Sequence, residues 1–262
     1  MLLTRELDET IRRAEIEGIR SGLGTVRRLS PDLGAASIEV AGGLAVFTGI
    51  NSPLSQAYGV GVHLPLAADE IARITAFYQS RGATPKIFVT PLSDPALARG
   101  LAAAGYAPSE YENVLASDEF DAHVARDARV AVAADLAEWA KASARAFSDA
   151  AELAEVDDEI ARVLASSDGV IALEARENGA IAATAAMDVR NGCAAFFAGS
   201  TLPPFRGRGF HLALIRDRIA RSRDAGAQMM RATASPASAS ERNFHRCGFS
   251  TLYTRVLWER RF

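Results

Sequence analysis

The stretch "LPPFRGRGFHLAL", residues 202–214, places two arginines and two glycines directly before an apolar helical pattern. The first turn of a helix presents unpaired N–H groups and the positive end of the backbone dipole. Glycines at that point let the backbone approach a phosphate closely, so that the amides bind it. The segment therefore predicts an anion-binding helix start, with Arg206 and Arg208 beside it.

Two other phosphate-binding motifs use the same physics, but this segment does not match them. A P-loop requires Gly-Lys-Ser/Thr at the helix start, and a dinucleotide fingerprint requires three glycines spaced GxGxxG. Here the position of the third glycine is Leu212.

The charge distribution also indicates an anionic partner. The chain carries a net charge of −3, yet the residues from 200 onward include twelve arginines and four acidic residues, a local balance of +8. Nucleic acid is one candidate, but stacking aromatics do not alternate with these arginines as they do in nucleic-acid-binding segments. A small phosphorylated ligand fits the pattern better.

The overall composition is that of a globular chain of one large or two smaller domains. It has 262 residues, 49% of them hydrophobic and 23% charged. Its apolar runs are shorter than the ~18 residues that span a bilayer, and its charged N-terminus does not read as a signal peptide. Cys193 and Cys247 lack metal-like spacing. We expect a cytoplasmic protein without a membrane or metal site.

The pattern of elements runs in the same order through both halves. In the first half a helix at 2–20 precedes strands near 36–41, 43–49 and 56–64, a helix at 67–81, a strand at 85–90, a helix at 94–104 and a strand at 106–116. In the second half a strand at 128–134 precedes helices near 135–148 and 156–167, strands at 169–176, 180–189 and 193–202, a helix at 208–224, a strand at 227–234, a helix near 238–247 and a strand at 249–260. We predict an α/β (α+β) chain of two similar domains, 1–120 and 126–262.

In the stretch at 202–214 the sequence resembles the GNAT N-acetyltransferases. Their acetyl-CoA signature is Q/R-x-x-G-x-G/A between a central strand and the next helix, and Arg206 and Gly209 match it at the correct spacing. The later "SASERNFHRCGF" resembles the family's second signature. The resemblance covers roughly 126–262 and implies GNAT-like domains, each a mixed, mostly antiparallel sheet flanked by helices.

The resemblance also implies roles for individual residues. The backbone of Gly199, Ser200 and Thr201 would pair with the pantetheine arm of acetyl-CoA, and Asn243 would touch that arm. The pyrophosphate would lie against the amides of a continuous run: Arg206, Gly207, Arg208, Gly209, Phe210 and His211.

Three positions depart from the family pattern. His211 stands where glycine or alanine is usual, Ala198 stands where a glutamate often serves as general base, and Phe244 stands where a tyrosine often serves as general acid. The catalytic residues therefore stay open, with Tyr253 and His245 as weak candidates. Other sources of a base are Glu174, Glu177, Asp188 or a water chain.

The corresponding helix start of the first half, in "HLPLAADEIARI", carries Asp69 and Glu70, which would repel a pyrophosphate. We expect a degenerate domain there that shapes the acceptor site. The leading hypothesis is an N-acetyltransferase that moves acetyl from acetyl-CoA to a small-molecule amine. The alternative is a catalytically weak acyl-CoA-binding regulatory or sensory protein. The oligomeric state is open, a homodimer being one option.

Overall fold

The computed structural model of the chain describes residues 3–67, 69–120, 124–147 and 155–260. They divide into two compact units. Unit 1 comprises Met1–Thr25 and Val114–Leu252, and unit 2 comprises Val26–Asn113 and Tyr253–Phe262. Two strands, β5 (Ala107–Ser117) and β11 (Ser250–Glu259), begin in one unit and end in the other.

The sheet of unit 1 has the strand order β5-β10-β9-β8-β7-β6. The pairs from β6 to β9 are antiparallel, and β9 pairs with β10 in parallel. Its remaining strands are β6 (Val130–Val132), β7 (Ile171–Glu177), β8 (Ala180–Arg190), β9 (Cys193–Thr201) and β10 (Met229–Ala234).

Tight turns join the central strands of this sheet. Asn178-Gly179 connects β7 to β8 and Asn191-Gly192 connects β8 to β9, and all four residues have positive φ, from 49° to 84°. Asn-Gly pairs favour this conformation, which matches the twist of the flanking strands. The strands predicted at 169–176, 180–189 and 193–202 are therefore joined as two consecutive hairpins.

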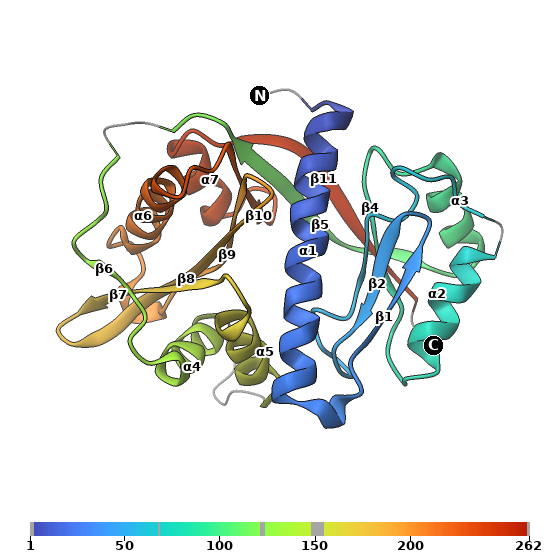
Figure 1. The fold of residues 1–262 in the computed structure, drawn as a ribbon, viewed down its shortest axis with the longest axis horizontal. Coiled ribbons are helices and arrows are strands. Elements are labelled where there is room, and N and C mark those ends of the chain that lie inside the picture. The colour runs from blue at the N-terminus through green and yellow to red at the C-terminus, as the bar shows by residue number, and fades with distance from the viewer. Residues whose placement is uncertain (1–2, 68, 121–123, 148–154, 261–262) are drawn as a thin grey trace. The chain divides into compact units, whose positions relative to one another are not determined.

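Helices cover both faces of this sheet (Figure 1). One face packs against α6 (Phe210–Asp224) and α7 (Ala239–Arg246) through a core that includes Leu173, Met187 and Phe196. The other packs against α4 (Leu136–Phe147) and α5 (Glu155–Ser166) through Trp139 and the alanines around it. The fully buried Trp139 donates its indole N–H to the carbonyl of Leu173, 2.8 Å away.

Unit 2 is a smaller version of the same architecture. Its strands follow the order β1-β2-β3-β4-β11, and its core includes Ile74, Tyr78, Ile87 and Leu97. Its elements are β1 (Ala36–Val40), β2 (Gly43–Phe47), β3 (Ala57–Tyr58), α2 (Glu70–Gln79), β4 (Lys86–Val89) and α3 (Pro95–Ala103). Asp94 caps α3 as expected, accepting the N–H of Ala96 at 2.8 Å.

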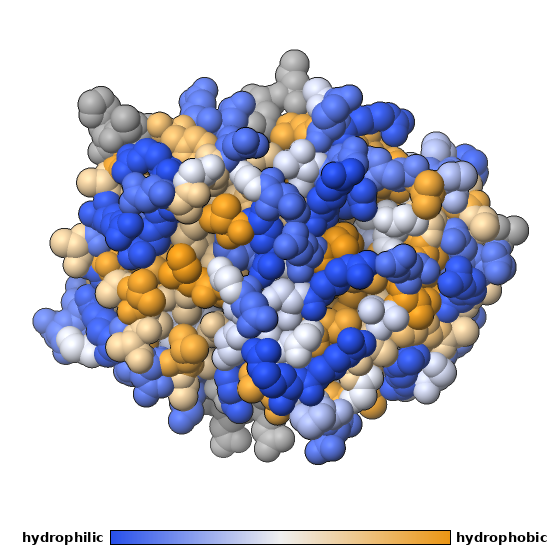
Figure 2. All heavy atoms as spheres, in the orientation of Figure 1, coloured by the Kyte–Doolittle hydropathy of each residue, from blue (hydrophilic) through white to orange (hydrophobic). Residues whose placement is uncertain are grey.

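The N-terminal helix differs from its prediction. α1 spans Arg5–Leu29 and does not stop at 20, because the glycines in "GIRSGLG" lie inside it. A β-carbon at Gly18 would lie 3.5 Å from the Asp188 carboxylate, an ordinary contact distance, so α1 packs against the end of β8 at this point. Hydrophilic side chains gather along the outer side of α1 (Figures 1 and 2). A second difference is β3, which pairs over two residues only, not over 56–64.

The predicted ranges 1–120 and 126–262 differ from the compact units at both chain ends. Most of α1 packs with unit 1, where Ile11 and Ala14 share a core with Ala116 and Met229. The last residues of β11 pair instead with β4. The compact units thus assign most of α1 to unit 1 and the last residues of β11 to unit 2, and the ranges stay a prediction from the sequence.

Candidate functional site

The centre of unit 1 contains an irregularity in β9. The β8–β9 register shifts between Thr184 and Ala186, and Ala198 opposite the shift has a φ of +49°. A left-handed alanine inside a strand is strained, and such strain is concentrated at functional positions. Ala198, which stands where the family often has its general base, is thus the bulged residue.

The parallel pairing of β9 with β10 also stops at this point. Its last pair is Phe196 with Ala232, although β9 continues to Thr201 and β10 to Ala234. The backbone of residues 197–201 therefore continues beyond the ladder on that side. Gly199, Ser200 and Thr201, predicted to hold a pantetheine arm, lie in this stretch.

The glycine loop follows directly. A single 3₁₀ turn at Pro203–Phe205 leads to Gly207 and Gly209, whose φ values are +78° and +80°. A β-carbon at either glycine would have no atom of the described chain within 4 Å. Gly209 is the N-cap of α6 and contributes no side-chain cap, so the first-turn amides remain available to a ligand.

The two loop arginines contact the protein itself. Arg206 donates to the carbonyls of Thr201 at 3.2 Å and Ala146 at 3.5 Å, and Arg208 pairs with Glu177. These contacts hold the loop against β9 and the end of α4. Any anion at the helix start would depend first on backbone amides.

His211 points back toward the strand. A β-carbon at Gly199 would lie 3.3 Å from its Nε2, and its Nδ1 lies 3.1 Å from Asn243 Nδ2 on α7. Asn243 Oδ1 accepts from Arg246, so its amide nitrogen faces the imidazole. Burial, with a contribution from Arg218, lowers the pKa of His211 to about 4. The imidazole is therefore neutral at pH 7, accepting at Nδ1 and protonated at Nε2.

Arg218 is a site residue that sequence reasoning did not identify. The arginines along α6 have the sequence pattern of a solvated helix face, whereas the side chain of Arg218 is fully buried. It donates to the carbonyls of Leu214, Ala186 and Phe197 at 3.1–3.5 Å, beneath the bulge. Its Nη2 has no hydrogen-bond partner among the described residues and would lie 3.4 Å from a Gly199 β-carbon. Burial lowers its pKa to about 9.

The structure separates the remaining catalytic candidates. His245 lies on α7 with Nδ1 2.9 Å from the Phe249 carbonyl, and Tyr253 lies in the part of β11 that belongs to unit 2. Asp188 pairs with Arg190 at 2.7 Å. Among the acidic candidates Glu174, Glu177 and Asp188, only Glu174 is a buried residue whose carboxylate keeps one oxygen without a hydrogen-bond partner among the described residues.

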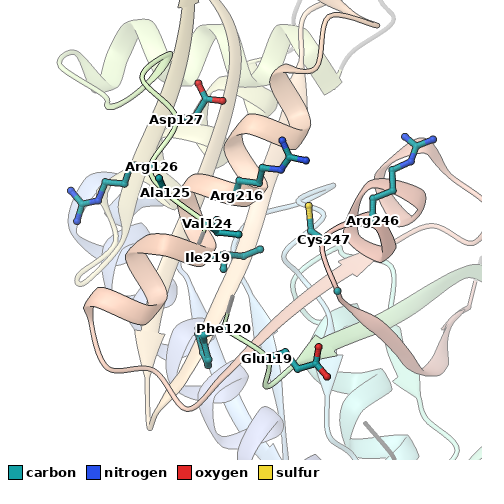
Figure 3. Close-up of a pocket in the computed structure, with 11 residues that line it drawn as sticks. Glu119, Phe120, Val124, Ala125, Arg126, Asp127, Arg216, Ile219, Arg246 and Cys247 are labelled. Carbon is teal, nitrogen blue, oxygen red and sulfur yellow. The ribbon is translucent and has the colours of Figure 1, made fainter. Parts of the chain in front are cut away.

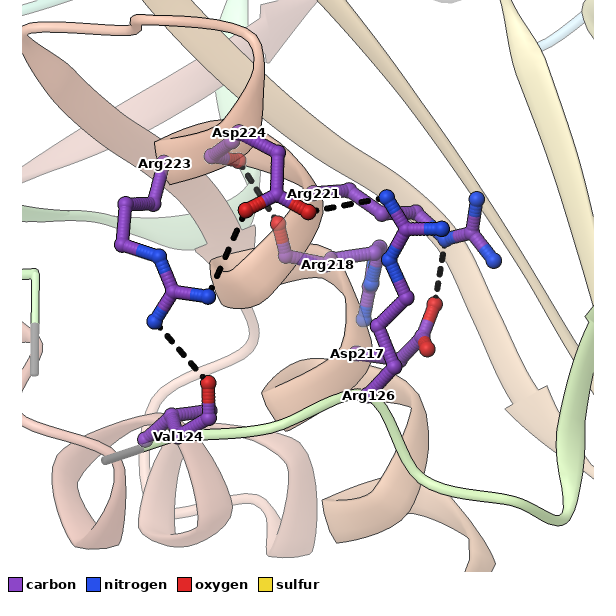
Figure 4. Close-up of polar contacts among 8 residues, drawn as sticks. Val124, Arg126, Asp217, Arg218, Arg221, Arg223 and Asp224 are labelled. Carbon is purple, nitrogen blue, oxygen red and sulfur yellow. Dashed lines mark hydrogen bonds and ion pairs between the residues drawn. The ribbon is translucent and has the colours of Figure 1, made fainter. Parts of the chain in front are cut away.

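A cavity of about 980 Å³ lies on the outer side of α6 (Figure 3). Arg216 and Ile219 reach it from α6, and Cys247 lies at the end of α7. Residues 124–127 form another wall and are fastened to the end of α6: Arg126 pairs with Asp224 at 2.8 Å (Figure 4). The rest of the lining comprises Glu119, Phe120, Val124, Ala125, Asp127, Arg246 and Gly248.

In unit 2, the corresponding helix start is occupied by its own carboxylate. Glu70 accepts the N–H of Ala41 at 2.9 Å and the N–H of Ala67 at 3.0 Å. Both carboxylate oxygens are thus engaged with backbone amides, and the charge of Glu70 lies at the helix start, where it would repel a second anion.

The described residues include neither a membrane-spanning helix nor a cluster of metal ligands. None of the helices there is long and apolar enough to cross a membrane. Nor do three or more His, Cys, Asp or Glu side chains in that part of the chain come together as metal ligands could.

Comparison with known proteins identifies the family. Residues 133–249 match the model of the acetyltransferase (GNAT) family, whereas no curated protein matches the sequence. A GCN5-related N-acetyltransferase from Kribbella flavida has a similar structure, with 20% identity, coverage of 100% of this chain and 97% of that one, and a TM-score of 0.69. A tandem GNAT protein from the clavulanic acid biosynthesis pathway has 15% identity, coverage of 98% and 96%, and a TM-score of 0.61.

An acetyltransferase of the GNAT family from Colwellia psychrerythraea is also similar, at 12% identity, with coverage of 89% and 87% and a TM-score of 0.53. These likenesses confirm the predicted GNAT fold. Residues 133–249 match the model of the GNAT acetyltransferase family, and the fold around them is that of GNAT proteins.

Proposed function

We propose that this chain transfers an acetyl group from acetyl-CoA to the amine of a small molecule. The observation that carries the proposal is the end of the β9–β10 ladder at Phe196, close along the chain to a helix start with two open glycines. The family supplies acyl transfer as the general activity. The cofactor, the amine and the cytoplasmic location are our inferences. The two free cysteines suit that location.

The residues present fit an acyl-CoA. Backbone groups of Gly199–Thr201 are suited to an amide-bearing arm, and the open first-turn amides of α6 are suited to a pyrophosphate. Arg218 Nη2, which has no hydrogen-bond partner among the described residues, faces the Gly199 position and would offer a donor to a carbonyl there. When bound, the thioester would supply an activated acyl group, and the protein would align an amine beside it.

The decisive experiment is thiol release from acetyl-CoA across a panel of small amines, paired with calorimetric binding of CoA. We expect binding and turnover with at least one amine. If CoA binds but none of the amines is acetylated, the result favours the alternative, an acyl-CoA-binding regulatory or sensory protein. That alternative is supported by Ala198, which stands where a glutamate often serves as general base.

A further inference from the structure

Three polar side chains form a row across the central strands of unit 1. Glu174 on β7 is the register partner of Thr184 on β8, and Thr184 is the register partner of Ser200 on β9. Directly opposed residues project from the same face, with β-carbons about 4.5–5.5 Å apart. The two hydroxyl oxygens lie 2.8 Å apart. We call Glu174, Thr184 and Ser200 the polar row.

The row is buried and begins at a partly satisfied carboxylate. The exposed fractions of Glu174, Thr184 and Ser200 are 4%, 0% and 7%. Glu174 Oε1 accepts from Arg176 Nε at 2.7 Å, but its buried Oε2 has no partner among the described residues. Leaving a charged acceptor without a partner is costly, so the arrangement calls for a donor at Oε2.

The far end of the row lies at the irregular stretch of β9. Ser200 follows the Ala198 bulge by two residues, beyond the last pair of the β9–β10 ladder. The row shares its face of the sheet with Ala172 and Ala186, which pack under Trp139 of α4. A buried carboxylate thereby lies in register beside two hydrogen-bonded hydroxyls, the second of which is at the strand edge assigned above to the acyl group.

We propose that the polar row receives the proton that the attacking amine loses; this rests on the acetyltransferase function proposed above. The amine nitrogen gives its proton to Ser200 Oγ, whose own proton moves to Thr184 Oγ1. Thr184 in turn gives its proton through one water to Glu174 Oε2, which has no direct partner among the described residues. Meanwhile the C–N bond forms, the thioester C–S bond breaks, and the thiolate leaves with the electron pair. Glu174 thus serves as the general base, the role of the glutamate that Ala198 replaces.

Paired variants at Thr184 test the relay with the side-chain volume nearly held. Thr184→Val removes the hydroxyl, whereas Thr184→Ser keeps it. With an amine that the wild-type chain acetylates, we expect kcat to fall roughly 10²-fold in Thr184→Val and in Glu174→Gln, the range of one acid–base group. Thr184→Ser should keep kcat within about threefold of wild type, because its hydroxyl can still pass the proton. KM for acetyl-CoA should be unchanged in all three.

Asp217→Asn is the matched control for neutralising a buried carboxylate. Asp217 is fully buried, pairs through one oxygen with Arg221 at 2.5 Å, and keeps its other oxygen without a described partner, yet it lies on α6 outside the row (Figure 4). The kcat of Asp217→Asn should stay near wild type. Equal losses of kcat in Asp217→Asn and Glu174→Gln would mean that both variants act through general destabilisation.

The ¹³C resonance of the Glu174 carboxyl group provides a second test that does not depend on turnover. In protein labelled with ¹³C-glutamate, the Glu174 carboxyl resonance is identified by its loss in Glu174→Gln. It should shift when the amine and CoA are added to wild-type protein, and the shift should shrink in Thr184→Val. An unmoved resonance contradicts the relay.

The outcomes separate the relay from the function on which it rests. Full turnover in Glu174→Gln, or equal kcat in Thr184→Val and Thr184→Ser, overturns the relay and leaves the acetyltransferase function standing. If wild-type protein binds CoA but acetylates none of the amines, the proposed function fails and the relay fails with it.

Discussion

His211 and Asn243 connect the first turn of α6 to α7 through a contact of 3.1 Å between Nδ1 and Nδ2. In the family's signatures the position of His211 is held by a small residue, and the residue at the position of Asn243 would touch the cofactor arm. Here the two side chains satisfy one another, and the imidazole also faces Gly199. His211 is therefore the residue to which cofactor affinity and pH response should be most sensitive.

The first prediction concerns stability at acid pH. The pKa of His211 is lowered from 6.5 to about 4, first by burial and then by Arg218, so below pH 6.5 the unfolded chain binds a proton that the folded chain does not. The free energy of unfolding should fall between pH 6.5 and 4, by up to about 3 kcal/mol from this group. Denaturation of wild type and His211→Gln at pH 7 and 4.5 measures it. Equal pH dependence in the two proteins would exclude His211 as the cause.

The second prediction concerns cofactor affinity. His211→Ala restores a small side chain at the signature position and releases Asn243, so calorimetry should show CoA binding severalfold more tightly. His245→Ala, on the same helix as Asn243 but directed at the Phe249 carbonyl, is the control and should leave the affinity unchanged. Weaker binding by His211→Ala would mean that the imidazole itself contacts the cofactor.

The third prediction concerns the arginine beneath the bulge. Arg218→Met keeps much of the volume but removes the donors to Leu214, Ala186 and Phe197, so the free energy of unfolding should fall by about 2–4 kcal/mol. Arg216→Met, on the exposed side of the same helix, should change it by less than about 0.5 kcal/mol. Urea denaturation measures both. A similar small effect in both variants would show that Arg218 does not support the bulge.

Local signals predicted much of the fold. Asn178-Gly179 and Asn191-Gly192 specify their hairpins through backbone conformation alone, and Asp94 with Pro95 specifies a helix start. The course of α1 past residue 20 could not be predicted in this way. Its glycines read as a helix end, and only tertiary contact, such as Gly18 against Asp188, explains why the helix continues.

The candidate site was predictable to a similar extent. The glycine loop is recognisable because Gly207 and Gly209 have to adopt positive φ immediately before a helix. The burial of Arg218 was not, since the alternation of arginines along α6 looks like a solvated face until the bulge provides carbonyls for it. The polar row was also hidden, because Glu174, Thr184 and Ser200 meet only through strand register.

The most direct test of the account is a calorimetric titration of acetyl-CoA into wild-type protein and two variants of one residue. Gly209 has a φ of +80° and open space around it, so Gly209→Glu places a charged side chain where the phosphate would lie. Gly209→Asn tolerates the left-handed conformation without adding charge and is the control. We predict one acetyl-CoA per chain, because Glu70 fills the corresponding helix start in unit 2. Binding should be lost in Gly209→Glu and retained, though weakened, in Gly209→Asn. Two molecules per chain, or unchanged affinity in Gly209→Glu, would contradict the assignment of the site to the start of α6.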